Sequence, residues 1–269
     1  MSGHTPDHDR GLAFDLATLN RRRVLALFGG AGLATLVGCA APSTATSPSS
    51  ATSSSSASSA TAAAGAVAEI PDETAGPYPG DGSNGPNILT ESGIVRSDIR
   101  SSFGSSSGTA QGVPLTVALS VQDGGKALAG AAVYLWHCDR DGNYSMYSRG
   151  VTDQNYLRGV QETDAAGKVT FTSVFPAAYD GRWPHIHFEV YPDVAEATRA
   201  GDPVKTTQLA FPKDVCEKVY ATDGYSASVG NLARTSLDTD MVFRDGHDTQ
   251  LATVTGDVSG YTASLVVGL

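Results

Sequence analysis

Short runs of β-branched and aromatic residues recur through most of the chain and constrain its fold more than any other feature of the sequence. Gly, Asp, Asn or Pro stand between the runs, and these residues favour turns. The runs cover residues 113–121, 131–138, 168–175, 184–191, 205–211, 239–245, 250–254 and 261–267. Many short strands at regular spacing predict an all-β fold, an antiparallel β-sandwich with irregular loops. The one helix that we predict is short and lies around residues 212–221.

The N-terminal part of the chain has the composition of an export signal. Residues 21–40, "RRRVLALFGGAGLATLVGCA", place a basic stretch before a short apolar run that ends in small residues. The apolar run is shorter than the roughly 20 residues that span a membrane. The consecutive arginines resemble the twin-arginine type of signal, and Leu-Val-Gly-Cys resembles a lipobox, in which Cys39 carries the lipid. We expect an exported protein, anchored by lipid on the outer face of the bacterial cytoplasmic membrane or released extracellularly.

A linker follows the signal. Residues 39–66 are almost entirely Ser, Ala and Thr, and such a segment lacks the apolar side chains that could offset the entropy of ordering it. We therefore divide the chain into an export signal at residues 1–38, a disordered tether at residues 39–66 and one folded domain at residues 67–269.

Net charge limits the partners of the exported protein. Without residues 1–38 it contains 14 Lys and Arg against 25 Asp and Glu, a formal net charge of −11. An acidic protein of this kind is not expected to bind nucleic acid, nor to bind membranes by electrostatic attraction. Membrane contact is expected only through the lipid.

Two cysteines remain once Cys39 is assigned to the lipid. Cys138 and Cys216 could form one disulfide, as cysteines of exported domains often do. They could equally be two buried free thiols, and the sequence leaves both alternatives open.

The segment "YDGRWPHIHFEVY", residues 179–191, carries candidate metal ligands. Side chains alternate along a strand, so His185 and His187 are expected on one face, opposite Ile186 and Phe188. Zinc structural sites usually add cysteine or further histidine, which this segment lacks. It contains Tyr179 instead, and a phenolate ligand at neutral pH requires a strongly acidic cation such as Fe(III). Spacing alone leaves zinc, copper, iron and no metal open.

Five motifs in order resemble those of the intradiol ring-cleavage dioxygenases, the relatives of protocatechuate 3,4-dioxygenase and catechol 1,2-dioxygenase. The motifs are "ETAGPYPG", "VRSDIR", "LWHCDRDGNYS", "YLRGVQETDAAGKVTFTSVFPAAYDGRWPHIHFEV" and "TTQLAFP", and they span nearly all of residues 70–221. The resemblance implies a β-sandwich that holds one Fe(III) per chain. The ligands that it implies are Tyr144, Tyr179, His185 and His187.

The resemblance also implies a reaction, in which a catechol-type diol and O₂ give a muconate-type diacid without an organic cofactor. Tyr179 would be displaced by the substrate and act as a base. Arg182 would stabilise charge on the bound diolate, and Gln208 would line the substrate pocket. Two departures stand out: the family usually has Pro-Gly before the second tyrosine, where this chain has Pro176-Ala177-Ala178, and Ala210 lies where ring-cleaving relatives often carry tyrosine. The alternative is an iron-binding, non-catalytic surface module for phenolic ligands; the oligomeric state is left open.

Replacing Cys39 by Ala should release or misprocess the protein, because the lipid would have no acceptor thiol. Membrane fractionation and mass spectrometry of the mature N-terminus measure this. A wild-type mature protein that stays in the soluble fraction with an intact Cys39 thiol would contradict the expectation.

Overall fold

The structure is a computed structural model of the chain and describes residues 67–269. The predicted export signal, the tether and Cys39 lie outside the described residues, so those assignments stay predictions. Within residues 67–269, no helix has the length and apolar character needed to cross a membrane.

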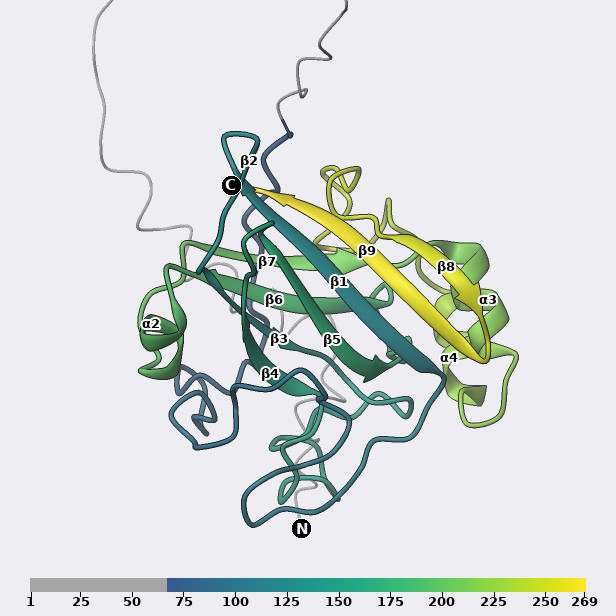
Figure 1. The fold of residues 1–269 in the computed structure, drawn as a ribbon. Coiled ribbons are helices and arrows are strands. Elements are labelled where there is room, and N and C mark those ends of the chain that lie inside the picture. Colours follow the sequence, from purple (N-terminus) through teal and green to yellow (C-terminus); the bar gives the residue numbers. More distant parts are fainter. Residues whose placement is uncertain (1–66) are drawn as a thin grey trace, which may run out of the picture.

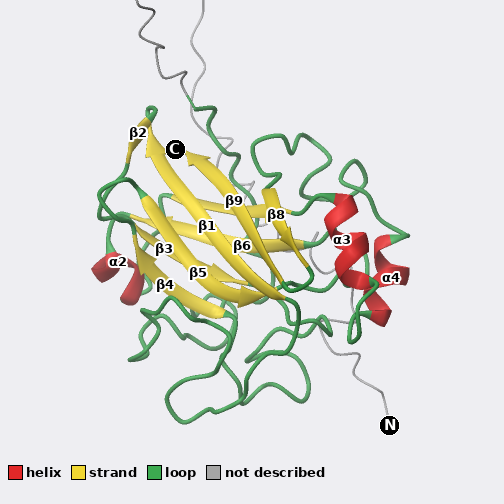
Figure 2. Ribbon diagram, turned by 45° about the vertical axis from the view of Figure 1, so that its right-hand side comes forward, coloured by secondary structure: helices red, strands yellow, loops and turns green. Residues whose placement is uncertain are grey.

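The described residues form two sheets that pack face to face (Figure 1, Figure 2). The first sheet has the order β2-β1-β9-β8, with β5 also paired to β1. The second has the order β4-β3-β6-β7. The strands of the first sheet are β1 (Pro114–Asp123), β2 (Lys126–Ala127), β5 (Lys168–Val174), β8 (Thr253–Asp257) and β9 (Gly260–Gly268). Those of the second are β3 (Ala132–Trp136), β4 (Arg158–Glu162), β6 (His185–Tyr191) and β7 (Lys205–Ala210).

This arrangement confirms the predicted β-sandwich, but one pairing differs from the prediction. Strands β1 and β9 run parallel over a register from Leu115↔Tyr261 to Gln122↔Gly268, whereas the other strand pairs are antiparallel. The sequence could not show this, because all the strands of the second sheet lie between β1 and β9 in the chain.

Alternating side chains build the core between the sheets. In β1 the residues Leu115, Val117 and Leu119 are buried, and their neighbours on the other face are partly exposed. In β6 the residues Ile186 and Phe188 join the same apolar cluster. The apolar positions of both sheets thus meet in one layer, as the period of two predicts.

The other face of the second sheet is also covered. All seven residues of β6 are buried, because a second cluster packs over Tyr134, Trp136 and Val160 on this face. Its covering residues come mostly from two loop regions, residues 75–94 and the loop that contains Tyr144, and the cluster also includes Ala177 and Ala197. His185 and His187 lie on the face opposite Ile186 and Phe188, as predicted, and they lie beneath loops instead of facing water.

Several element predictions were wrong, and strands β2 and β4 were not predicted. Helix α3 (Lys213–Tyr220) matches the predicted helix, but α2 (Val194–Thr198) and α4 (Ser226–Leu232) were not predicted. The strand predicted at residues 239–245 is a series of turns. There the Asp240 carboxylate accepts hydrogen bonds from the backbone amides of Val242 and Phe243, and these local bonds replace a strand ladder.

Cys138 and Cys216 are both buried free thiols, with no disulfide between them. Of the two alternatives that the sequence left open, this is the second. The Cys138 thiol is directed at the Ala177 carbonyl, 3.7 Å away, and belongs to the cluster outside the second sheet. Cys216 lies on α3 and packs into the core between the sheets. The two side chains therefore belong to different layers.

Both thiols should be inert to a thiol reagent in the native protein and react after unfolding without reductant. Burial excludes the reagent and raises the pKa of both thiols. Labelling followed by peptide mapping distinguishes them from Cys39. A Cys138–Cys216 cross-linked peptide from unreduced protein would contradict this.

Candidate metal centre

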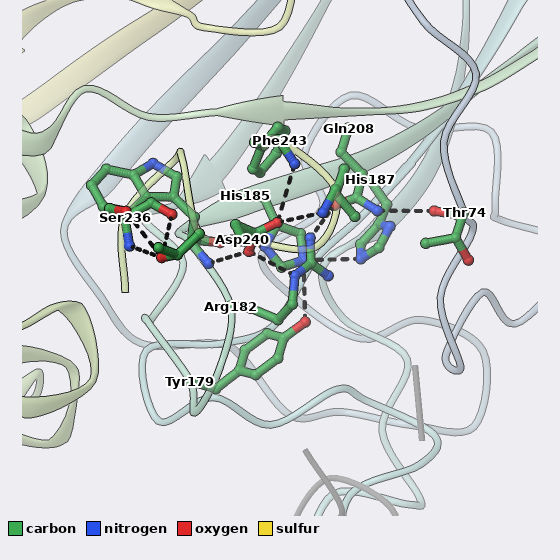
Figure 3. Close-up of polar contacts among 12 residues, drawn as sticks. Thr74, Tyr179, Arg182, His185, His187, Gln208, Ser236, Asp240 and Phe243 are labelled. Atoms are coloured by element: carbon green, nitrogen blue, oxygen red, sulfur yellow. Dashed lines mark hydrogen bonds and ion pairs between the residues drawn. The ribbon is translucent and has the colours of Figure 1, made fainter. Parts of the chain in front are cut away.

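Four side chains converge on one point at the end of β6. The Tyr179 hydroxyl lies 3.2 Å from His185 Nε2, and the Tyr144 hydroxyl lies 3.5 Å from both of these atoms. His187 Nε2 lies 3.1 Å from His185 Nε2. Figure 3 shows Tyr179, His185 and His187 directed toward one another. The structure therefore brings together all four residues that the sequence proposed as metal ligands.

Neighbouring groups fix the orientation of both histidines. His185 Nδ1 donates to the Trp183 carbonyl at 2.5 Å, which leaves the lone pair of Nε2 facing the other three groups. The His187 ring stacks on Trp136, with centroids 5.1 Å apart and planes 7° from parallel. Burial lowers the pKa of both histidines well below the usual value, and the nearby Arg182 charge adds to this. Both imidazoles are therefore neutral, the form that binds a metal.

The two tyrosines differ in how firmly they are held. Tyr144 is buried, its backbone amide donates to Ser148 Oγ at 2.9 Å, and its ring packs against Tyr78. Tyr179 is partly exposed and comes from the loop that precedes β6. Burial raises the pKa of Tyr144 well above its usual value, an effect that Tyr179 increases and Arg182 opposes. Tyr144 thus remains a neutral phenol unless a cation compensates the phenolate charge.

The residues fit a hard, highly charged cation. Four ligands, each about 2 Å from one ion, lie about 3 Å apart, close to the 3.1–3.5 Å spacings of these atoms. Among residues 67–269, no group of three or more His, Cys, Asp or Glu could hold a metal, so the tyrosines complete this donor set. Phenolate oxygen and imidazole nitrogen suit Fe(III) better than the soft ions that prefer thiolates.

Arg182 and Gln208 lie beside the four ligand candidates. Arg182 Nη2 donates to Gln208 Oε1 at 2.6 Å, and Gln208 Nε2 donates to the Thr74 carbonyl at 2.9 Å. In the β6–β7 register Gln208 is the partner of His187. The buried amide of Gln208 thus has the hydrogen-bonding partners that its place in an apolar strand requires.

Arg158 is a second buried arginine that the sequence analysis did not single out. It lies in β4, and its guanidinium donates to the carbonyls of Tyr78, Pro79 and Ser145 and to the hydroxyls of Tyr134 and Ser145. It therefore joins the loop that covers the site to the loop that carries Tyr144. Arg158 and the apolar Val160 are two residues apart and therefore lie on the same face of the strand. This spacing could have indicated a buried arginine.

Comparison with known proteins identifies the family of this chain. The sequence profile of a family described as Dioxygenase matches residues 85–237. Chlorocatechol 1,2-dioxygenase from Rhodococcus opacus is 39% identical over 62 residues, 23% of this chain and 24% of the relative. Catechol 1,2-dioxygenase 2 from Acinetobacter lwoffii is 44% identical over 55 residues, 20% of each. The chain spans about a quarter of the length of the curated relatives it matches.

The fold is also that of a solved structure. An intradiol ring-cleavage dioxygenase from Tetranychus urticae superposes with a TM-score of 0.60 and 24% identity, over 75% of this chain and 94% of that one. The family profile covers more than half of the chain, and this protein belongs to the intradiol ring-cleavage dioxygenase family. The resemblance recognised in the sequence motifs is thereby confirmed.

Replacing Arg158 by Met should lower the free energy of unfolding by about 3 kcal/mol, because three buried carbonyls each lose a donor at a cost of about 1 kcal/mol or more. Urea unfolding measures the change. Arg149→Met, at an exposed position, is the control and should have little effect. Equal stability of Arg158→Met and the control would show that Arg158 does not hold the two loops together.

Proposed function

We propose that this protein is a non-haem Fe(III) dioxygenase that cleaves a catechol-type aromatic diol with O₂ to a muconate-type diacid, with both oxygen atoms incorporated into the product. The observation that carries the proposal is the convergence of two phenols and two neutral imidazoles in a mostly buried site. Family membership supports the class of reaction.

Tyr144, Tyr179, His185 and His187 would hold the metal. Bound Fe(III) would supply Lewis acidity that binds the diolate and makes its ring open to attack by O₂. Loops cover both histidines and Tyr144, so they exclude water and strengthen electrostatic interactions in the site.

Tyr179 is the ligand suited to be displaced. It is partly exposed and belongs to a loop, whereas Tyr144 is enclosed. Its phenolate oxygen can take one of the two protons of the entering diol and hold it as a neutral phenol, while the other proton passes to solvent water. Tyr179 thereby acts as the base, and the remaining three side chains keep their places.

Arg182 stabilises the negative charge of the diolate ring. Its guanidinium is buried, charged and tied to Gln208, so it is oriented before the substrate arrives. Preorganised charge of this kind is a large contribution to catalysis because no reorganisation is needed during the reaction. Gln208 lines the pocket and keeps the Arg182 guanidinium in place.

We also propose that the protein is exported and anchored through lipid on Cys39. The support comes from the order of signal, lipobox and Ser/Ala/Thr-rich segment in the sequence. The substrate would then be a diol met outside the cytoplasm.

The purified protein should contain one Fe(III) per chain and be red-brown, because phenolate-to-iron charge transfer absorbs visible light. Tyr144→Phe removes the enclosed phenolate and should abolish most of the colour. Tyr179→Phe should change the spectrum and retain part of the iron. Tyr261→Phe, a buried tyrosine of β9 in the core between the sheets, is the control. Elemental analysis and visible absorption measure both; a colourless protein that binds stoichiometric zinc after iron supplementation would refute this ligand assignment.

Oxygen uptake with a panel of catechols tests the reaction itself. Arg182→Gln should keep the iron colour and slow turnover, on the order of 30- to 1,000-fold for the loss of 2–4 kcal/mol of transition-state stabilisation. Arg199→Gln, at an exposed arginine, should behave as wild type. A coloured wild type that consumes no oxygen with any catechol would favour the non-catalytic binding module.

A further inference from the structure

Asp240 is a fully buried carboxylate beside the candidate active site. It lies between α4 and β8, outside residues 85–237 that the family profile matches. Its side chain is 0% exposed, and that of its ion-pair partner Arg182 is 2% exposed. A buried ion pair is stable only where hydrogen bonds satisfy both groups. The partners of Asp240 therefore indicate what it does.

The two carboxylate oxygens of Asp240 have different partners. Oδ1 accepts from the backbone amides of Val242 and Phe243 at 2.8 and 3.3 Å, which closes the turn that carries Asp240. Oδ2 accepts from Arg182 Nε at 2.9 Å and from the Trp183 amide at 2.7 Å. One oxygen thus shapes its own turn and the other reaches the site, as Figure 3 shows.

These contacts fix Arg182 from two sides. Asp240 holds Nε, and Gln208 holds Nη2 at 2.6 Å. A planar guanidinium held at two of its nitrogens has little freedom to rotate. Of these two hydrogen bonds, only the one to Gln208 would remain without Asp240. The guanidinium could then rotate about that bond.

Asp240 also secures the residue between Arg182 and His185. The Trp183 backbone amide donates a hydrogen bond to Asp240, and its carbonyl accepts one from His185 Nδ1. Its indole Nε1 donates a hydrogen bond to the Phe211 carbonyl at 2.9 Å. Trp183, which lies between Arg182 and His185 in the chain, is therefore held at both its backbone amide and its backbone carbonyl.

We propose that Asp240 is a positioning residue for ring cleavage, and that it holds Arg182 in the orientation that stabilises the bound diolate. The inference rests on the proposed function of the site. Asp240 contacts none of the four ligand candidates in the hydrogen bonds described, so it can act on the reaction only through Arg182 or through the backbone of Trp183. The proposal assigns its effect on the rate to the contact with Arg182.

A double-mutant cycle of Asp240→Asn and Arg182→Gln tests this. An Asn that keeps its oxygen on the amides of Val242 and Phe243 turns its NH₂ group toward the Nε–H of Arg182, where two donors face each other. The substitution therefore leaves the turn intact and breaks the contacts with Arg182 and with the Trp183 amide. Asp238→Asn, at an exposed position of the same segment, is the matched control for the loss of one negative charge.

Asp240→Asn should lower kcat by about tenfold and raise KM by about threefold, with the iron colour retained. In the Arg182→Gln background the same substitution should change kcat less than about twofold, because the arginine through which it acts is gone. Asp238→Asn should leave kcat unchanged. Equal effects of Asp240→Asn in both backgrounds, or no effect in the wild-type background, would overturn the proposal.

Anaerobic binding of 4-nitrocatechol, followed by its visible spectrum, separates this proposal from the proposed function because it needs no turnover. Asp240→Asn should change the dissociation constant by at least about threefold in the wild-type background and not in the Arg182→Gln background. A wild type inert to catechols would refute the dioxygenase reaction, while a flat binding cycle would refute the positioning role. If Asp240→Asn does not fold, Asp240→Glu, which keeps the charge and shifts the oxygens by one methylene, replaces it in both cycles with the same expected results.

Discussion

Burial of the outer face of the second sheet is the constraint on which the site depends. A two-layer sandwich usually leaves the outer face of each sheet to water, yet every residue of β6 is buried. The loops that cover this face bring backbone carbonyls out of water, and each needs a donor. Arg158 supplies donors to Tyr78, Pro79 and Ser145. A single guanidinium thus supplies donors to three of the carbonyls in the loops that enclose the two histidines.

The same burial governs the electrostatics of the site. In a poorly hydrated environment charges are costly unless they are paired. The structure meets this condition locally: His185 and His187 are neutral, and the Arg182 cation is paired with Asp240. The positive charge beside the ligand candidates is therefore retained without being left unpaired. Loops that are remote in the sequence, from Thr74 to Asp240, contribute to this arrangement.

The sequence predicts those features that depend on local periodicity or on motifs. Alternation alone placed His185 and His187 on one face of a strand, and the motif order led to the family and to the four ligand candidates. Asp240 and the parallel pairing of β1 with β9 could not be found in this way. The apolar and β-branched residues around Asp240 suggest a strand. The segment forms a turn instead, and the Asp240 carboxylate in that turn bonds to Arg182 and Trp183, 57 or more residues away in the chain.

Charge balance in a buried site explains why one tyrosine is enclosed and the other partly exposed. A trivalent cation held by two phenolates would carry one net positive charge, and a diol bound as the dianion, after loss of both its protons, would turn this into one net negative charge. Transfer of one of those two protons to a phenolate, which then leaves as neutral phenol, would return the site to neutrality. An unpaired buried charge is costly, so the entering diolate favours this release. Tyr144 is enclosed and held by Ser148, whereas Tyr179 is partly exposed on a loop, so in the proposed reaction Tyr179 would be the residue that leaves.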